Sequence, residues 1–234
     1  MVLRRWGKLP EFMCNESVRI YYDNLKHKKF QLIIKRLFDL ILSIKGIIIL
    51  SPLMLVIALL IKLSSKGSVF FKQKRITQYG RVFNIIKFRT MVENAENLGE
   101  AVTISGDKRI TKIGLHLRKY RLDELPQLIN VLKGDMSFVG VRPEAVEYIS
   151  YYDDEMFASL LLPAGITSKA SIQYKDEALI LSEAVRNGID IKDAYVNIVL
   201  PQKMKINLDS IRNFSLKEEI KIIFSTFGVL FGII

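Results

Sequence analysis

The feature that most constrains the fold is an apolar segment near the N-terminus, residues 40–61, with the sequence LILSIKGIIILSPLMLVIALLI. Lys45 is its one charged residue. As a straight α-helix this segment would extend about 33 Å, which is enough to cross the hydrocarbon core of a bilayer. A polar stretch precedes it and no small-residue cleavage site follows, so it does not fit a secretory signal peptide. The segment therefore predicts a membrane helix.

Ser51 and Pro52 interrupt this segment in its middle. Proline lacks a backbone N–H and clashes with the preceding helical turn, so a kink is expected there. Basic residues flank the segment on both sides, whereas a single crossing normally keeps its positive charge on the cytoplasmic side. Together these signals favour a re-entrant membrane helix over residues 35–64, which enters the membrane, bends at Ser51-Pro52 and leaves on the same face. A straight crossing and a buried core helix are the two alternatives.

The positive charge of the chain is concentrated in one region. The net charge is +11, and residues 62–121 contain fourteen Lys and Arg but four acidic residues. Such a block indicates a polyanionic partner, which could be nucleic acid, anionic lipid headgroups or a phosphate-rich small substrate, or else a solvated basic face. A single cysteine, Cys14, excludes an internal disulfide and a Cys-rich zinc site, and two histidines are too few for a His-based metal site.

The remaining patterns predict a mostly helical α+β fold. Alternation predicts two strands within residues 68–76 and 81–91, joined by a turn at Tyr79-Gly80. Residues 105–114 are expected to be a polar loop, residues 163–174 a loop and a strand, and residues 216–234 an amphipathic tail. Residues 1–28 show no sustained period and are expected to cover the surface or to be mobile. Helices are predicted over residues 91–100, 113–119, 148–161, 176–187 and 193–206.

Two adjacent acids open the densest stretch, RLDELPQLINVLKGDMSFVGVRPE, residues 121–144. Apolar residues at positions 125, 128, 129 and 132 fall on one helix face. Asp123 is then predicted to be the N-cap, with Pro126 in the first turn and Gly134 ending the helix. Helix capping by Asp123, and stabilisation of Glu124 by the helix dipole, would explain both acids without any chemistry.

The same acids also suit phosphate chemistry. Backbone N–H groups and the helix dipole are expected to lower both pKa values, which would keep both acids ionised at neutral pH. An ionised aspartate can attack phosphorus, and a neighbouring glutamate can bind Mg²⁺ together with phosphate oxygens. The basic block would neutralise the charge of a phosphodiester. The sequence thus predicts a phosphate-handling site at Asp123 and Glu124.

Further motifs occur in one order along the chain: KRLFD from residue 35, the Ser-Pro break, KFRTM from 87, DKRITKIGLHLRK from 107, LDELPQLINVLKGDMSFVG from 122, RPE and PAGIT. This order resembles the bacterial sugar transferase family, the monotopic polyprenyl-phosphate phosphoglycosyl transferases of surface polysaccharide and glycoprotein biosynthesis. The resemblance covers residues 35–234, and the longest motif is highly specific. The chain is similar to the short form, without the additional multi-helix membrane domain.

The resemblance implies transfer of a phosphosugar from a UDP-sugar to undecaprenyl phosphate, with release of UMP. It implies that Asp123 is the nucleophile, that Glu124 and Asp123 hold Mg²⁺, and that Arg142 belongs to the nucleotide-sugar site. Other basic residues match family positions that would contact phosphates, although each could instead be an ion-pair partner or a lipid-headgroup contact: Lys74, Arg75, Lys87, Arg89, Arg109 and Arg118.

The resemblance also implies an organisation and a location. Residues 1–34 form an N-terminal leader, residues 35–64 the re-entrant helix, and residues 65–234 a cytosolic catalytic domain with short strands and amphipathic interfacial helices. The expected location is the cytoplasmic face of the bacterial inner membrane, on an anionic lipid bilayer. The oligomeric state and the identity of the sugar stay open.

Three departures from the family pattern bear on the substrate side rather than on the acid pair. Val141 replaces the first proline of the usual Pro-Arg-Pro motif, Ser168 and Lys169 follow GIT where the family usually has glycine, and residues 76–80 read ITQYG. Two rival functions remain. A membrane-attached nucleic-acid binder would need aromatic stacking platforms, and none is recognisable, so no nucleic-acid partner is expected. A non-catalytic scaffold of the same family would not require the intact acid pair.

Overall fold

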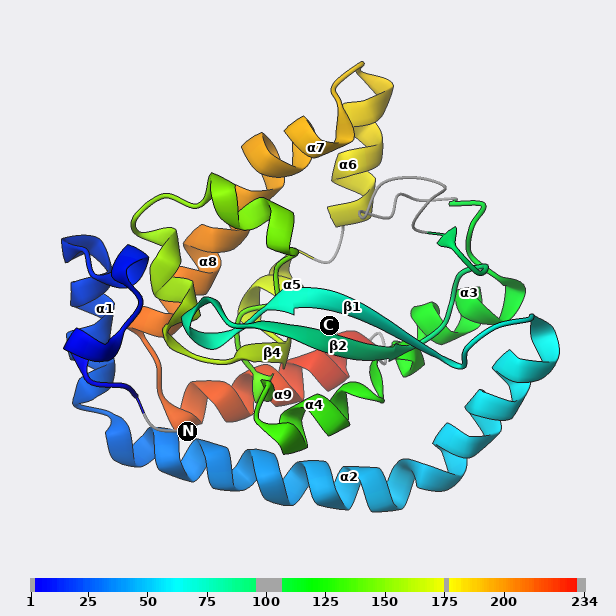
Figure 1. Cartoon of the computed structure of the whole chain (residues 1–234), viewed down its shortest axis with the longest axis horizontal. Helices are drawn as coiled ribbons and strands as arrows, with labels where there is room; N and C mark the ends of the chain where they lie inside the picture. Colours follow the sequence, from blue (N-terminus) through cyan, green and yellow to red (C-terminus); the bar gives the residue numbers. More distant parts are fainter. Residues whose placement is uncertain (1–2, 96–106, 175–176, 231–234) are drawn as a thin grey trace.

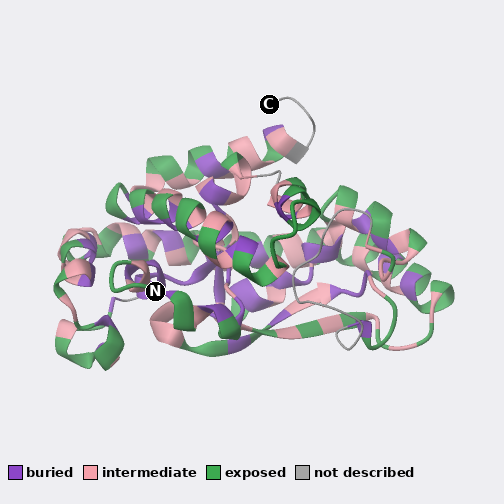
Figure 2. Cartoon of the chain, turned by 90° about the horizontal axis from the view of Figure 1, so that it is seen from above, coloured by how far each residue is buried: buried purple, intermediate pink, exposed green. Residues whose placement is uncertain are grey.

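The computed structural model describes residues 3–95, 107–174 and 177–230. The chain forms a mostly helical α+β fold with two small sheets and one long apolar helix, as predicted (Figure 1). Buried residues gather where the strands and helices meet in the middle of the molecule (Figure 2). The α-helices are α1 Glu16–Lys26, α2 Lys29–Ser64, α3 Lys112–Lys119, α4 Gln127–Lys133, α5 Lys169–Gln173, α6 Glu177–Arg186, α7 Ile191–Ala194, α8 Leu200–Arg212 and α9 Leu216–Leu230. The strands are β1 Phe70–Ile76, β2 Val82–Phe88, β3 Met136–Val139 and β4 Ala164–Thr167.

The N-terminal segment belongs to the core, which the sequence did not predict. Two 3-10 turns, η1 Trp6–Lys8 and η2 Glu11–Met13, lead into α1. The side chain of Asn15 caps α1 by accepting a hydrogen bond of 2.8 Å from the N–H of Val18. Val18 and Leu25 are completely buried among residues of α8 and of the 3-10 helix η7, Met156–Leu161. The amphipathic face of α1 therefore packs into the fold.

Helix α2 spans 36 residues and contains Pro52 without a break in its assignment. It lies along one edge of the molecule and curves in its C-terminal half (Figure 1). Pro52 has no N–H to donate to the carbonyl of Ile48, four residues back, but the hydroxyl of Ser51 donates to this carbonyl at 2.8 Å. Ser51 thus satisfies the acceptor that Pro52 leaves open, which matters wherever no water reaches the backbone.

Buried polar contacts fix the first half of α2 to the rest of the chain. The ammonium group of Lys35 donates to the carbonyl of Val139 at 2.8 Å and forms an ion pair with Glu219 of α9. The carboxylate of Asp39 accepts hydrogen bonds from Ser137 Oγ and Phe138 N, at 2.8 and 3.1 Å. Charged groups this deeply buried are costly unless they are paired, so these contacts set the position of α2 against β3 and α9.

Strands β1 and β2 form the predicted hairpin, antiparallel with Phe70 opposite Phe88 and Ile76 opposite Val82. Side chains alternate between its two faces. The inner face packs on α4 and on the parallel pair β3–β4, in a cluster that contains Phe83, Ile85 and Val131. The register places positions 71, 73, 75, 83, 85 and 87 on the inner face and positions 72, 74, 84 and 86 on the outer face.

Several expected elements differ from the observed ones. The helix predicted over residues 148–161 is two 3-10 helices, η6 Val146–Tyr151 and η7, separated by a turn that Asp153 caps at the N–H of Met156. The predicted helix over residues 193–206 starts earlier and contains a π-helical turn, Tyr195–Val199, just before Pro201. Strand β3 was not predicted. The expected helix over residues 91–100 is wrong in its described half, where Met91 forms an isolated bridge with Ile110 and Asn94 has a φ of 59°; its second half and the start of the 105–114 loop lie outside the described residues.

Candidate active site

The acid pair lies in a single 3-10 turn, η5 Leu122–Glu124, between α3 and α4. Arg121 precedes it in the left-handed conformation, with φ of 51°. Asp123 and Glu124 are both buried, each with 8% of its surface exposed. The predicted N-cap role of Asp123 is wrong, because α4 begins only at Gln127 and no side chain caps it. A turn separates Asp123 from α4, so its carboxylate is not used for capping.

Two cations from distant parts of the chain meet at Glu124. Arg142, in the loop after β3, donates from Nη2 to Glu124 Oε1 at 2.9 Å. Lys87, on the inner face of β2, lies 3.3 Å from the same oxygen. Within the described part of the chain, no contact engages the other oxygen, Oε2. Glu124 is therefore held by one oxygen and can offer the second.

The two carboxylates differ in acidity. Burial opposes ionisation of Glu124, but Arg142 and Lys87 outweigh it and hold the pKa of Glu124 well below its usual value. Burial raises the pKa of Asp123, and the charge of Glu124 raises it further against the opposing charges of Lys87 and Arg118. The expectation that both pKa values are lowered is correct for Glu124 and wrong for Asp123. Asp123 is the more basic member of the pair.

A further arginine, Arg118, faces this pair, and Arg75 lies next to Arg142. Arg118 of α3 donates from Nε to Thr90 Oγ1 at 2.8 Å, and burial lowers its pKa against the charge of Asp123. Arg75 shares the inner hairpin face with Lys87, and its guanidinium is oriented by Gln73 Oε1 at 2.6 Å. Burial lowers the pKa of Arg75, and the charge of Arg142 lowers it further, although Glu144 opposes both effects. The structure thus gathers Lys87, Arg118 and Arg142 around the acids, with Arg75 beside Arg142.

The other predicted phosphate contacts lie elsewhere. Lys74 occupies the outer face of the hairpin, opposite Asn84. Arg89 is buried and donates from Nη2 to the carbonyl and the hydroxyl of Ser65, which ties the end of α2 to β2. Arg109 forms an ion pair of 2.6 Å with Asp107 and donates to the carbonyl of Ala95. These contacts give Arg89 and Arg109 structural partners.

A polar layer behind Arg142 was not predicted. The hydroxyl of Tyr195, in the π-helical turn, donates to Glu144 Oε2 at 2.7 Å. Lys203 of α8 forms an ion pair of 2.9 Å with Glu177 at the start of α6, and its ammonium lies 5.4 Å from the centre of the Tyr195 ring. Glu144 belongs to the RPE motif and was visible in the sequence. The other three residues come from helices far along the chain, and no local pattern indicated them.

The departures from the family pattern have separate structural places. The carbonyl of Val141 accepts a hydrogen bond of 2.8 Å from Gly165 N, so β4 holds the turn before Arg142 without the usual proline. The backbones of Gly140 and Gly165 approach so closely that position 165 requires glycine, because a Cβ there would lie 2.1 Å from Gly140 N. Ser168 caps α5 by accepting a hydrogen bond from Ser171 N.

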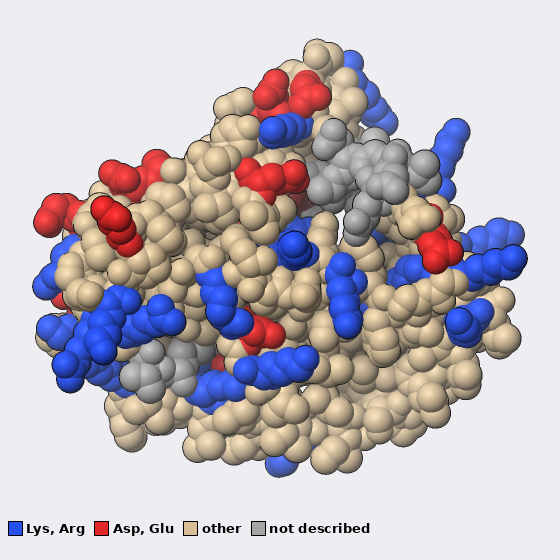
Figure 3. Space-filling view, viewed as in Figure 1, with Lys and Arg blue, Asp and Glu red and all other residues tan. Residues whose placement is uncertain are grey.

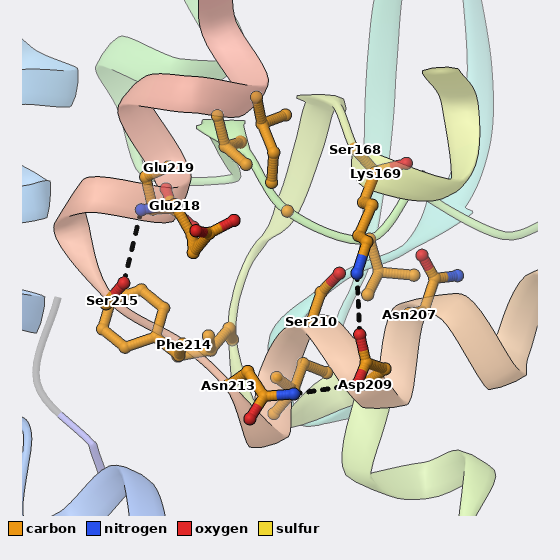
Figure 4. Close-up of a pocket in the computed structure, with 16 residues that line it drawn as sticks. Ser168, Lys169, Asn207, Asp209, Ser210, Asn213, Phe214, Ser215, Glu218 and Glu219 are labelled. Carbon is orange, nitrogen blue, oxygen red and sulfur yellow. Dashed lines mark hydrogen bonds and ion pairs between the residues drawn. The ribbon is translucent and has the colours of Figure 1, made fainter. Parts of the chain in front are cut away.

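Ser168 and Lys169 line a cavity of about 290 Å³ between the end of β3, α5, α8 and α9 (Figure 4). Lys169 points toward Asp209 across it, and the two side chains form an ion pair of 2.8 Å. The cavity contains neither member of the acid pair and none of the basic residues predicted for the site. These two departures therefore face this cavity rather than the acids.

The residues present fit a magnesium ion that also uses ligands from a substrate. Asp123 and Glu124 are adjacent, and Oε2 of Glu124 is available. Among the described residues, no group of three or more His, Cys, Asp or Glu side chains could hold a metal by itself. Mg²⁺ is typically bound through one or two carboxylates, with phosphate oxygens and water completing its shell.

Comparison with known proteins places this geometry in a family. The family model described as bacterial sugar transferase matches residues 30–232, which include every element from α2 to α9. The chain belongs to the bacterial sugar transferase family. The recognition made from the sequence motifs is thereby confirmed.

Curated relatives of this bacterial sugar transferase carry related names. It is 38% identical over 197 residues to the UDP-N-acetylgalactosamine-undecaprenyl-phosphate N-acetylgalactosaminephosphotransferase of Aeromonas hydrophila, an alignment that covers 82% of this chain and 42% of the relative. It is 35% identical to the exopolysaccharide production protein ExoY of Sinorhizobium fredii, covering 67% and 74%. It is 34% identical to the UDP-glucose:undecaprenyl-phosphate glucose-1-phosphate transferase of Caulobacter vibrioides, covering 82% and 67%. The chain thus spans less than half the length of the Aeromonas relative.

Proposed function

We propose that this chain transfers a phosphosugar from a UDP-sugar to undecaprenyl phosphate and releases UMP, as the first membrane step in the synthesis of a surface polysaccharide or glycoconjugate. The names of the relatives support the reaction class. One structural observation carries the proposal: Asp123 and Glu124 are adjacent and buried, and Lys87 and Arg142 from distant segments both contact Glu124 Oε1. This arrangement supplies a nucleophile and a positive environment for a diphosphate.

In this proposal Asp123 is the nucleophile. An oxygen of its carboxylate attacks the phosphorus that bears the sugar, and the bond from that phosphorus to the bridging oxygen breaks, so that UMP leaves with the electron pair. A phosphate oxygen of undecaprenyl phosphate then attacks the same phosphorus and displaces the Asp123 carboxylate. Burial and the charge of Glu124 make Asp123 more basic, which favours attack once it is ionised.

The surrounding cations would bind the donor. Arg142 and Lys87 lie within reach of the acids and can move from Glu124 to the donor's phosphate oxygens. Arg75 and Arg118 extend this positive surface from the hairpin and from α3. A diphosphate held by these groups would present its sugar-bearing phosphorus to Asp123.

We further propose that Asp123 and Glu124 hold Mg²⁺, with Glu124 contributing the unengaged Oε2. When bound, the ion would neutralise charge on the diphosphate. Only two protein carboxylates are available there, so the remaining ligands would come from the donor and water.

We propose that α2 is re-entrant and attaches the chain to the cytoplasmic face of the inner membrane. Its apolar side chains are largely exposed, including Ile48, Ile49 and Leu63 at 67, 72 and 85%. Exposed Phe224 and Phe227 of α9 extend this apolar surface. Transfer of such a surface into lipid would be strongly favourable. The hydrogen bond from Ser51 to Ile48 suits a bend in lipid at Pro52.

The experiment that tests the reaction is mass spectrometry of the purified protein after incubation with a UDP-sugar and Mg²⁺, without the lipid acceptor. We expect a phosphosugar adduct on the peptide containing Asp123, with an equal amount of UMP released. Asp123→Asn should form no adduct, while Asp154→Asn, at an exposed site, should behave as wild type. Full turnover by Asp123→Asn would contradict the nucleophile assignment, and absence of UMP with every UDP-sugar would favour the scaffold alternative.

A further inference from the structure

A groove with a polar and charged lining lies along the free edge of β2, next to the end of α4, and contains neither member of the acid pair. It encloses about 300 Å³ and is lined by the hairpin and by the C-terminal turn of α4. Figure 3 shows Lys and Arg side chains across this face of the molecule, above the mostly uncharged surface along its lower edge, where α2 lies. The lining residues are Lys72, Arg81, Phe83, Asn84, Ile86, Asn130, Lys133 and Asp135.

The charge of this groove is positive. Three of its side chains are cations and one is an acid. Arg81 pairs with the acid, Asp135, through Nη1 at 2.7 Å. Lys72 and Lys133 are exposed, and no ion pair engages either of them among the described residues. Two lysines and the remaining donors of Arg81 are therefore available to one anion of the size of a phosphate group.

The groove is rigid where it meets α4. The side chain of Asn130 accepts a hydrogen bond from Ile86 N at 3.0 Å and donates to Asn84 O at 2.8 Å, so α4 is fixed to the edge of β2. Asn130 is 1% exposed. Lys72 and Lys133 thus project from two elements whose separation cannot easily change, which reduces the entropy lost when they bind one anion.

The position of the groove relative to α2 identifies the source of the anion. Helix α4 packs directly on α2, where Gly46 lets Leu128 approach, since a Cβ at Gly46 would lie 3.2 Å from Leu128 Cδ1. Arg36 of α2 donates to the carbonyls of Val131 and Leu132 at the end of α4. Leu132, next to Lys133, is exposed. The groove therefore lies beside a helix that packs on α2, where lipid headgroups would be close if α2 is embedded.

We propose that this groove binds the headgroup phosphate of an anionic glycerophospholipid, through Lys72 and Lys133 with Arg81 as the third donor. The proposal rests on the membrane attachment of α2 but not on the transfer reaction. The groove contains none of the cations near the acid pair, and Lys72 and Lys87 lie on opposite faces of the hairpin, so the bound lipid is distinct from the acceptor substrate. Its headgroup would fix the height and tilt of the hairpin that carries the catalytic cations.

The test measures the acetylation rate of individual lysines by mass spectrometry, with the full chain in vesicles of phosphatidylcholine alone or mixed with phosphatidylglycerol. We expect phosphatidylglycerol to slow acetylation of Lys72 and Lys133 about fivefold or more, since each basic contact at a charged surface is worth about that factor. Lys74 is the internal control, because it lies on the same hairpin face but outside the groove. Equally slowed acetylation of Lys74 would show that phosphatidylglycerol acts through the surface potential alone, which would overturn the proposal.

A second measurement uses the double variant Lys72→Gln/Lys133→Gln and the control Arg186→Gln/Lys205→Gln, whose residues are exposed on α6 and α8. Native mass spectrometry after extraction from mixed nanodiscs should show a retained phosphatidylglycerol in wild type and control, and its loss in the double variant. Displacement of the retained phosphatidylglycerol by undecaprenyl phosphate in the wild-type protein would make the groove an acceptor site and contradict the proposal. Protection of the two lysines by inorganic phosphate alone, in detergent, would equally contradict a lipid site. Failure of all variants to bind phosphatidylcholine vesicles would instead contradict the attachment through α2.

Discussion

At the scale of single residues, Glu124 connects the two halves of the site. Lys87 comes from the hairpin and Arg142 from the loop after β3, and both contact the same oxygen. The sequence could identify the acids and the cations because residue type and motif carry that information. It could not show that two cations share Oε1 or that Asp123 is the more basic acid, because both depend on burial and on contacts between distant segments.

The charge of Glu124 should control the pH dependence through Asp123. Glu124 raises the pKa of Asp123, so Glu124→Gln should lower it. In the proposed mechanism Asp123 must be ionised to attack, so activity should be lost as the pH falls through the pKa of Asp123. The acidic limb of kcat/KM should therefore move to lower pH in Glu124→Gln, although the maximal rate falls. Lys87→Gln should move the limb the other way, because Lys87 lowers the same pKa. The measurement is the pH profile of the residual activity in both variants. If the acidic limb of kcat/KM stays at the same pH in both, that limb reports the titration of a group other than Asp123.

Arg142 should bind the donor in a way that lysine cannot reproduce. Its guanidinium offers several donors in one plane, while an ammonium group is a point charge. Loss of charge-assisted hydrogen bonds costs about 1.5–3 kcal/mol, which corresponds to roughly tenfold to hundredfold in affinity. Calorimetric titration of UDP-sugar should show this loss for Arg142→Ala, with at most partial recovery for Arg142→Lys, both in the Asp123→Asn background that prevents turnover. Unchanged affinity in Arg142→Ala would remove it from the donor site.

At the scale of elements, local signals predicted what local interactions decide. The β1–β2 hairpin, α3, α6 and the amphipathic α9 follow from alternation, helical period and turn residues. Strand β3 has four residues and pairs in parallel with β4, with Met136 opposite Ala164, 28 positions later in the sequence. Because its partner is so distant, no local sequence pattern indicated this strand. The π-helical turn before Pro201 follows from the missing N–H of proline, which prevents a regular α-helical bond there. Asp123 failed as an N-cap because an additional 3-10 turn precedes α4.

Asn130 should be the side chain on which the contact between α4 and the hairpin most depends. Its buried side-chain amide accepts a hydrogen bond from Ile86 N and donates one to Asn84 O, the two contacts that a neighbouring strand would otherwise make at this edge of β2. Asn130→Ala removes both hydrogen bonds and leaves two strand-edge groups without partners, so we expect a loss of about 2–4 kcal/mol in the free energy of unfolding. Thermal unfolding in detergent should show a lower midpoint, while Asn187→Ala at an exposed site should leave it unchanged. Equal midpoints would mean that water replaces the amide at this edge.

At the scale of the whole molecule, the apolar and charged surfaces are separated. Helices α2 and α9 expose apolar side chains, the hairpin above α2 carries a basic outer face, and the acids lie on the other side of that hairpin. Lys35 and Glu219 pair between α2 and α9 and hold these two apolar helices together. The order of these surfaces is what an enzyme needs when one substrate is a lipid phosphate and the other is dissolved in water.

This arrangement leads to the prediction that both ends of α2 face the cytoplasm. Cys14 is an exposed thiol before α2, and Ser64, at the end of α2, is exposed and can be replaced by cysteine after Cys14 is removed. In intact cells, an impermeant maleimide should label neither thiol, and both should react after the membrane is permeabilised. Labelling of one thiol from the periplasm would show that α2 crosses the membrane.

The bend itself can be tested with the same reporters. Ser51→Ala/Pro52→Leu restores a backbone donor at position 52 and removes the hydroxyl that now contacts Ile48. A straight helix of this length and hydropathy is long and apolar enough to cross a bilayer, so we expect a fraction of the variant to insert with the end near position 64 in the periplasm. That fraction should become accessible to maleimide at Ser64→Cys and should lose activity, because its catalytic domain is then on the wrong side. If the variant keeps both thiols protected in intact cells, the contacts of Lys35 and Asp39 with β3 determine the topology, rather than Ser51 and Pro52.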